Sequence, residues 1–449
     1  MGIIREIISV LLCSSAVHAQ EPVTTTVVEK KTVEERLAEL EAQQSLNYFS
    51  FSGTLVTSYD DLRAEETYPV KRDHDALDYL RLRFSLNIDA EVNPQVKVYS
   101  RTTVTKFFNR WQQQGNSGVF NEDLEIAYSE AGSQVYLERA YADLSPMGSD
   151  WTLSVGRLPT IHGSPSNFWD LLPRSGTYAM MSYNSILDGI AGTYRLDRYL
   201  AEGNQWALRL LYTPFTSVNG GTPGGADGFL NPPRQDTNAG TPTGSVTNTI
   251  MDLISFQSDY SSKNVDFTNQ LGFILQGYQL TDLPIPSGAG TSNLNILYRA
   301  ATASVELDGL GQSGFDISLN FSYNQNESRG FFNGPGTGFG TVKESDTIYG
   351  NLALISTRYR WEKWSLGYEW LEASKNSVYF SGAEEDLTDF YRTNGVGHHV
   401  YVTKKWMSYV TLRGGYRLQQ LTNLPVFLGP AAPTDRKVET LYVNMRTDF

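Results

Sequence analysis

Apolar and polar side chains alternate along much of the chain after residue 48. In 80–89 every second residue is large and apolar, the residues between are charged or polar, and 315–324 and 410–418 repeat the pattern. A period of two indicates β-strands, because successive side chains of a strand point to opposite faces. Each segment is about ten residues long, as a tilted strand needs to cross the hydrocarbon of a membrane.

The connections between these segments are of two kinds. Short turns are expected at 91–94, 145–148, 197–203, 261–265, 308–311, 360–363 and 405–407, and long polar or glycine-rich loops at 60–78, 109–132, 216–249, 325–343 and 373–397. A soluble β-sandwich also alternates, but short turns opposite long loops are typical of outer-membrane barrels. We therefore predict an all-β fold, a closed antiparallel transmembrane β-barrel of about sixteen strands over 48–449, with both chain ends in the periplasm.

Tryptophans accompany the predicted short turns. Five of them lie in or beside these turns: Trp151, Trp206, Trp361, Trp364 and Trp406. Such a position suits an aromatic ring at the level of the lipid headgroups. The alternative is the ordinary preference of Trp for strands, which does not explain their concentration at one set of turns.

The residues before the barrel differ from it. Residues 1–19 read as a cleaved signal peptide, with Arg5, an apolar stretch and small residues before the cleavage site. The one cysteine, Cys13, lies inside it, and Leu12 before it disfavours lipidation. Residues 20–47 form a periplasmic segment with a short coiled-coil-like amphipathic helix at 32–44. A frayed spacer explains the same residues equally well.

Charge and hydropathy narrow the class of protein. The formal net charge is -13, which disfavours a nucleic-acid partner. The sequence contains no apolar run near the roughly 18 residues of a membrane helix. A chain of this composition enters a membrane only as a closed barrel, which pairs all its backbone groups. The expected location is thus the outer membrane of a Gram-negative bacterium, in contact with its lipid.

The last strand ends on an aromatic residue. Its alternate positions are Leu441, Val443, Met445, Thr447 and Phe449. This end resembles the terminal signal by which the barrel-assembly machinery recognises outer-membrane proteins, which implies that machinery as a partner. Thr447 departs from the pattern, since an aromatic residue is often found there.

A second resemblance covers 139–189. The stretches 139–144, 155–159, 163–168, 174–178 and 187–190 are similar to the signature of a porin-like bacterial outer-membrane family catalogued as a domain of unknown function. This resemblance implies a barrel and brings no assigned activity, so it carries over no catalytic or binding residue.

Arginines are frequent at the polar positions of the strands. The candidates for the lumen and for selectivity are Arg81, Arg83, Arg101, Arg139, Arg157, Arg195, Arg209, Arg413 and Arg417. Fixed guanidinium groups favour anionic solutes by charge and by bidentate contact. The alternative is that carboxylates across the lumen pair with them, namely Asp89, Asp143, Glu306, Asp316 or Glu369.

The segment 158–188 contains three prolines, which forbid a regular strand ladder. Its apolar residues are unsuited to a wet exterior, so we expect it to fold into the barrel as a constriction or plug. The candidate residues are His162, Asn167, Phe168, Trp169, Arg174 and Tyr178. An external loop with its own small apolar cluster is the alternative.

The candidate functions belong to different classes. A hydrolase needs a nucleophile oriented by a base, and the proximity of His162 to Ser164 does not supply that geometry. His398 and His399 point to opposite faces of a strand and cannot share a metal. We expect no enzyme, cofactor or metal, but a porin or solute-specific channel for small hydrophilic, anionic solutes, trimeric by analogy with general porins. The alternative is a non-conducting scaffold, adhesin or sleeve for a partner protein.

Overall fold

The computed structural model divides the chain into two units, Met1–Asn47 and Tyr48–Phe449. It describes residues 48–68, 72–107, 135–170, 174, 176–216, 250–281, 297–327, 347–377, 380–381, 388, 390–424 and 432–449. The predicted signal peptide and periplasmic helix lie outside these residues. Among the described residues, no helix has the length and apolar character needed to cross a membrane.

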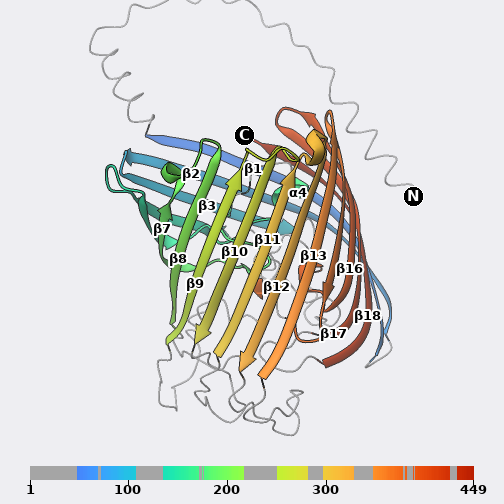
Figure 1. The fold of residues 1–449 in the computed structure, drawn as a ribbon. Coiled ribbons are helices and arrows are strands. Elements are labelled where there is room, and N and C mark those ends of the chain that lie inside the picture. Colours follow the sequence, from blue (N-terminus) through green and yellow to red (C-terminus); the bar gives the residue numbers. More distant parts are fainter. Residues whose placement is uncertain are drawn as a thin grey trace, which may run out of the picture. The chain divides into compact units, whose positions relative to one another are not determined.

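The second unit is a closed barrel of sixteen antiparallel strands, as predicted (Figure 1). The first half of the chain forms β1 (Phe49–Tyr68), β2 (Arg72–Asn93), β3 (Val96–Phe107), β4 (Val135–Leu144), β5 (Trp151–Arg157), β7 (Asp188–Arg195), β8 (Asn204–Thr216) and β9 (Ile250–Ser262). The second half forms β10 (Gln270–Thr281), β11 (Leu297–Asp308), β12 (Phe315–Glu327), β13 (Thr347–Trp361), β14 (Trp364–Ala373), β16 (Gly395–Met407), β17 (Val410–Leu424) and β18 (Ala432–Asp448).

The barrel closes where β18 pairs with β1. Beyond the last strand, the Phe449 amide donates to the Gly53 carbonyl at 3.0 Å, and the Gly53 amide donates to the Phe449 carbonyl at 2.8 Å. The Phe449 ring stacks on Phe84 with centroids 6.0 Å apart. A Cβ on residue 53 would lie 2.4 Å from this ring, so only glycine fits under it. The terminal residue is therefore part of the seam of the barrel.

Alternation sorts the side chains onto two faces. On β12, Leu319, Phe321 and Tyr323 are exposed on the outer face, whereas Ser318 and Asn320 are buried on the inner face. The outer face of the neighbouring strands is likewise apolar, whereas their inner face carries polar residues such as Ser356 and Glu369 together with buried apolar ones such as Leu354 and Leu371. A closed barrel can do this because every backbone group is paired while only alternate side chains need be apolar.

Each of the seven predicted short turns lies at or beside a connection between two consecutive strands. These connections join β2 to β3, β4 to β5, β7 to β8, β9 to β10, β11 to β12, β13 to β14 and β16 to β17. Two of these connections contain single 3₁₀ turns, η1 (Asp197–Tyr199) and η3 (Leu310–Gln312). Trp151, Trp361, Trp364 and Trp406 are exposed beside these turns. Tyr48 and Asp448 bond to the turn residues Glu91 and Tyr409, so both ends of the barrel sequence lie at the short-turn end.

The first of the predicted long loops is wrong. Residues 60–78 belong mostly to β1 and β2, which extend to Tyr68 and resume at Arg72. Charged residues on the outer face here, such as Asp61 and Arg63, conceal the alternation, but ladder bonds form regardless of side-chain polarity. Most of the predicted loops 109–132, 216–249 and 325–343 lies outside the described residues.

Candidate functional site

The segment 158–188 lies against the inner face of the barrel wall. It contains one helical turn, α4 (Asn167–Asp170), and a two-residue strand, β6 (Tyr183–Asn184). Most apolar side chains among its described residues are buried, including Phe168, Met180, Met181 and Tyr183. Met180 and Met181 pack with Leu352, Leu354, Leu371 and Ala373, which are inward-facing residues of β13 and β14. The burial of these side chains on folding supplies the main attraction between segment and wall.

Polar contacts attach the same segment to β9, β10 and β11. Gln257 Nε2 donates to the Thr177 carbonyl at 2.9 Å, and the Ala179 amide donates to Gln276 Oε1 at 3.0 Å. Arg174 Nη2 lies 2.7 Å from Asp259 Oδ2. Ser164 Oγ bonds to Ser304, at 3.2 Å, and to Glu306. Because these partners are spread over three strands, the segment is held along its length.

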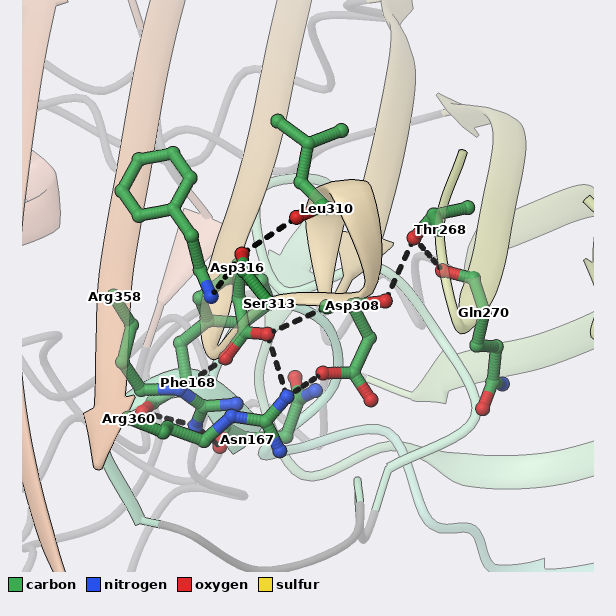
Figure 2. A network of polar contacts seen from close by, with 12 residues as sticks. Asn167, Phe168, Thr268, Gln270, Asp308, Leu310, Ser313, Asp316, Arg358 and Arg360 are labelled. Carbon is green, nitrogen blue, oxygen red and sulfur yellow. Dashed lines mark hydrogen bonds and ion pairs between the residues drawn. The ribbon is translucent and has the colours of Figure 1, made fainter. Parts of the chain in front are cut away.

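A network of arginines and aspartates fixes the helical turn (Figure 2). Arg358 Nη1 donates to the carbonyl oxygens of Asn167, at 3.0 Å, and Phe168, at 2.5 Å, while its Nε donates to Asp316 at 2.7 Å. Its guanidinium also lies 5.0 Å from the centroid of the Phe168 ring. Arg360 binds Asp308 and, at 2.6 Å, Asp316. The buried guanidinium of Arg358 thus joins the wall to the segment.

A second segment folds inward, contrary to the prediction of an external loop at 373–397. Its strand β15 (Phe380–Ser381) pairs in parallel with β6, and its 3₁₀ turn η4 (Phe390–Arg392) follows. Phe390 and Tyr391 are buried in the cluster with Met180 and Met181. The polar residues of this stretch suggested a solvent-exposed loop. Inside the barrel, however, Thr393 and Asn394 donate hydrogen bonds to backbone carbonyls.

Burial also affects the tyrosines of the inner segment. Removal from water raises the pKa of Tyr178 to about 12 and raises the pKa of Tyr183 well above 10. The rings of Tyr183 and Tyr278 lie edge to face with centroids 5.4 Å apart. Both phenols of the segment therefore remain neutral and serve packing and hydrogen bonding.

The remaining constriction candidates are placed as follows. The His162 backbone has a positive φ of 55°, and its amide donates to Asn184 Oδ1 at 3.0 Å. Asn167 contributes its carbonyl to the Arg358 contact. The side chain of Trp169 lies outside the described part of the chain.

Several predicted arginines lie on the inner face with acidic partners. Arg83 and Arg101 both lie 3.1 Å from the fully buried carboxylate of Glu138. Arg81 pairs with Asp60 at 3.1 Å. Arg209 on β8 pairs with Asp259 on β9 at 2.9 Å. Arg195 pairs with Asp197 at 3.6 Å, at the short-turn end of the barrel.

Three other predicted lumen arginines lie on the inner face of strands β4 and β17. Arg139 lies opposite Arg101 beside a bulge of the β3–β4 pair. Arg413 and Arg417 lie on β17 opposite the buried residues Asn444 and Thr440. Of the carboxylates expected to pair with arginines, Asp316 binds Arg358, whereas Glu306 and Glu369 accept from Ser164 and Ser356.

Arg157 does not face the lumen. It lies opposite Asp188 in the β5–β7 pair and shares the outer face with Val155 and Leu153, which are exposed. Its guanidinium binds the Asp188 carboxylate at 2.7 Å and the Leu137 carbonyl at 2.7 Å. The alternation that begins at Trp151 predicts this outward direction, since odd positions carry the apolar residues of β5.

Sequence reasoning missed several inner-face residues. Glu138, Asp60 and Asp259 are the main partners of the predicted arginines, and Arg358 and Arg360 were not among the candidates. The signal for the two arginines was present, because Ser356, Arg358 and Arg360 alternate with Ile355, Thr357 and Tyr359. The acids carried no such signal, because pairing across strands depends on register.

The two adjacent histidines point to opposite faces, as predicted. His398 Nδ1 lies 2.9 Å from the hydroxyl of Tyr368, an exposed residue of the outer face. His399 is buried on the inner face, with Nδ1 2.6 Å from Glu369 Oε2 and Nε2 2.7 Å from the Tyr442 hydroxyl. These polar side chains belong to the inner wall beside the second inward segment.

Comparison with known proteins agrees with the resemblance found in 139–189. Residues 73–209 match the family described as "Protein of unknown function (DUF3373)", a range that contains the whole signature. No curated protein matches the sequence.

Solved structures similar to this chain include an outer membrane protein and an anion-selective porin. A loop-deletion mutant of OmpT, an outer membrane protein of Vibrio cholerae, is 13% identical over 89% of this chain and 99% of its own, with a TM-score of 0.45. OmpF of Salmonella typhi in complex with daunomycin is 10% identical over 89% and 97%, with a TM-score of 0.45. An anion-selective porin from Comamonas acidovorans is 11% identical over 89% and 100%, with a TM-score of 0.46.

Proposed function

We propose that this protein is an outer-membrane channel for small hydrophilic solutes, with a preference for anions and a passage narrowed by 158–188. The observation that carries the proposal is the closed barrel with an apolar outer face, a charged inner face and a segment attached inside it. A closed barrel is one of two structures that can span a lipid bilayer, and a polar interior suits water-filled passage. The proposal assigns no catalytic role to the chain.

The position of the short turns supports an orientation. In barrels of this class the short turns face the periplasm, and here both ends of the barrel sequence lie at that end. The proposal therefore includes export by the signal peptide, periplasmic ends, and Phe449 as the residue read by the barrel-assembly machinery. Homotrimer formation in the outer-membrane lipid belongs to the same proposal.

The charge of the inner wall supports anion preference. The adjacent strands β17 and β18 carry four inward-facing arginines, namely Arg413, Arg417, Arg436 and Arg446. Of these four, Arg446 pairs with Asp448 at 2.8 Å. The carboxylates of β9 to β12 are bound by neighbouring side chains: Asp259 by Arg174 and Arg209, Glu306 by Ser164, and Asp316 by Arg358. Only β16 separates β17 from β14, so the guanidinium groups of β17 and β18 lie on the inner face next to that wall, where they attract anions.

Planar-bilayer recording tests the channel itself. Purified barrel is expected to give steady single-channel conductance, and a salt gradient is expected to give a reversal potential on the anion side. Clear cation selectivity would contradict the anion preference, and the absence of steady conductance would favour a scaffold, adhesin or sleeve.

Deletion of 164–178 tests the narrowing. These residues contain the attachments through Ser164, Arg174 and Thr177, so their removal should raise the single-channel conductance. An equally long deletion within 217–249, the connection from β8 to β9, is the control and should leave the conductance closer to that of the intact chain. Equal conductance of the 164–178 deletion and the intact chain would refute a constriction.

A further inference from the structure

The ring of Tyr442 lies between two arginines of the neighbouring strand. Tyr442 on β18 is paired with Gly415 on β17, and Arg413 and Arg417 flank that glycine on the same face. The guanidinium carbons lie 5.6 Å (Arg413) and 4.6 Å (Arg417) from the ring centroid. A Cβ on residue 415 would lie 2.6 Å from the Tyr442 hydroxyl, so the ring occupies the space that glycine leaves. Both cations thus lean over one aromatic ring, an attractive arrangement.

Buried hydrogen bonds hold this ring in place. The Tyr442 hydroxyl lies 2.7 Å from His399 Nε2, and His399 Nδ1 lies 2.6 Å from Glu369 Oε2. Glu369 also accepts from Ser356 Oγ at 2.8 Å and from the Tyr391 hydroxyl at 3.0 Å. With the Nδ1 proton directed at the carboxylate, Nε2 accepts from the phenol. The chain of bonds connects β13, β14, β16 and β18, so the ring is a rigid support for the two arginines.

The two guanidinium groups are close enough to act on one solute. Their distances to the shared ring limit the separation of the guanidinium carbons to about 10 Å. The Asn444 amide oxygen accepts from Nε and Nη2 of Arg413, at 3.2 and 2.9 Å, in the amide orientation that satisfies both groups. This bond fixes the plane of one guanidinium fork. Forks of this kind bind phosphate and carboxylate with two parallel bonds, which an ammonium group does not do.

We propose that Arg413, Arg417 and Tyr442 form a discrete binding site for a solute with two neighbouring phosphate or carboxylate groups. This inference rests on the proposed function, because the solute reaches the site through the lumen. The proposed function needs only the positive charge of the inner wall, whereas this inference assigns anion binding to two guanidinium groups held at one aromatic ring. Attraction by the wall depends on charge alone, whereas the site depends on the guanidinium forks.

Arg→Lys substitutions distinguish the binding site from the general positive charge, because lysine keeps the charge and lacks the guanidinium fork. Pyrophosphate binding to the detergent-solubilised full barrel is measured by titration calorimetry, which requires no conductance. Arg413→Lys/Arg417→Lys is expected to weaken binding at least about tenfold, since charged hydrogen bonds are lost. The matched control is Arg436→Lys/Arg446→Lys, which changes two other inward arginines of the same wall and should stay within about twofold.

Each outcome has one meaning. Equal affinities for the two double variants, or no binding of pyrophosphate to the intact chain, would overturn the site even if the channel conducts anions. Binding that is lost only in the Arg413→Lys/Arg417→Lys variant would support the site even if bilayers show no conductance, in which case the proposed channel function fails alone. Heat-modified migration on a detergent gel verifies folding of each variant, and Arg417→Lys alone, with about threefold weaker binding expected, serves if the double variant does not fold.

Discussion

Replacing Arg358 with methionine should release the helical turn of the inner segment from the barrel wall. The substitution removes two bonds from a buried guanidinium to the carbonyl oxygens of Asn167 and Phe168. A hydrogen bond to a charged group contributes about 1.5 to 3 kcal/mol, so the attachment loses at least about 3 kcal/mol. That loss raises the population of the undocked turn roughly 100-fold. The apolar cluster around Met180 and Met181 remains, so the release should be local.

Hydrogen exchange measured by mass spectrometry reports this release. The amides of Ser166 and Phe168 donate to the Gly163 and Pro165 carbonyls where the chain enters the turn, so peptides that contain them should exchange roughly 100-fold faster in Arg358→Met. Arg360→Met is the matched control, because Arg360 shares the Asp316 carboxylate and binds Asp308 rather than the turn. Its exchange at the turn should stay within about threefold of the intact chain. Equal acceleration in both variants, or none in Arg358→Met, would refute the attachment.

Two further predictions concern packing and charge inside the barrel. Gly367→Ala should lower the melting temperature, because its Cβ would lie 2.0 Å from the Tyr401 ring and such overpacking costs about 1 to 3 kcal/mol. Gly277→Ala, whose Cβ meets its nearest neighbour at 3.7 Å, should change it far less, and equal melting shifts would contradict the argument. Asp259→Asn removes the carboxylate shared by two arginines and should shift the reversal potential toward anions. Asp252→Asn, which loses a bond to exposed Tyr212, should leave it unchanged; a similar shift in both would refute a lumen effect.

The sequence by itself determined the strands, the short turns and the two faces of the wall. A period of two is a local property, because neighbouring side chains of any strand point to opposite faces. This period predicted the sixteen-stranded barrel and the outward tryptophans. Counted from Trp151, it also places Arg157 on the outer face, although Arg157 was expected in the lumen. Charged residues on both faces of β1 and β2 concealed the full length of those strands.

Only the tertiary structure decided what lies inside the barrel. The position of 158–188 depends on Gln276, Ser304 and Arg358, which are far away in sequence and meet the segment only after the barrel closes. The partners of the arginines depend on strand register, which brings Glu138 between Arg83 and Arg101. Tyr442 reaches His399 for the same reason, across a strand pair that alternation does not specify. Long-range pairing, unlike period, is not contained in any short stretch of the chain.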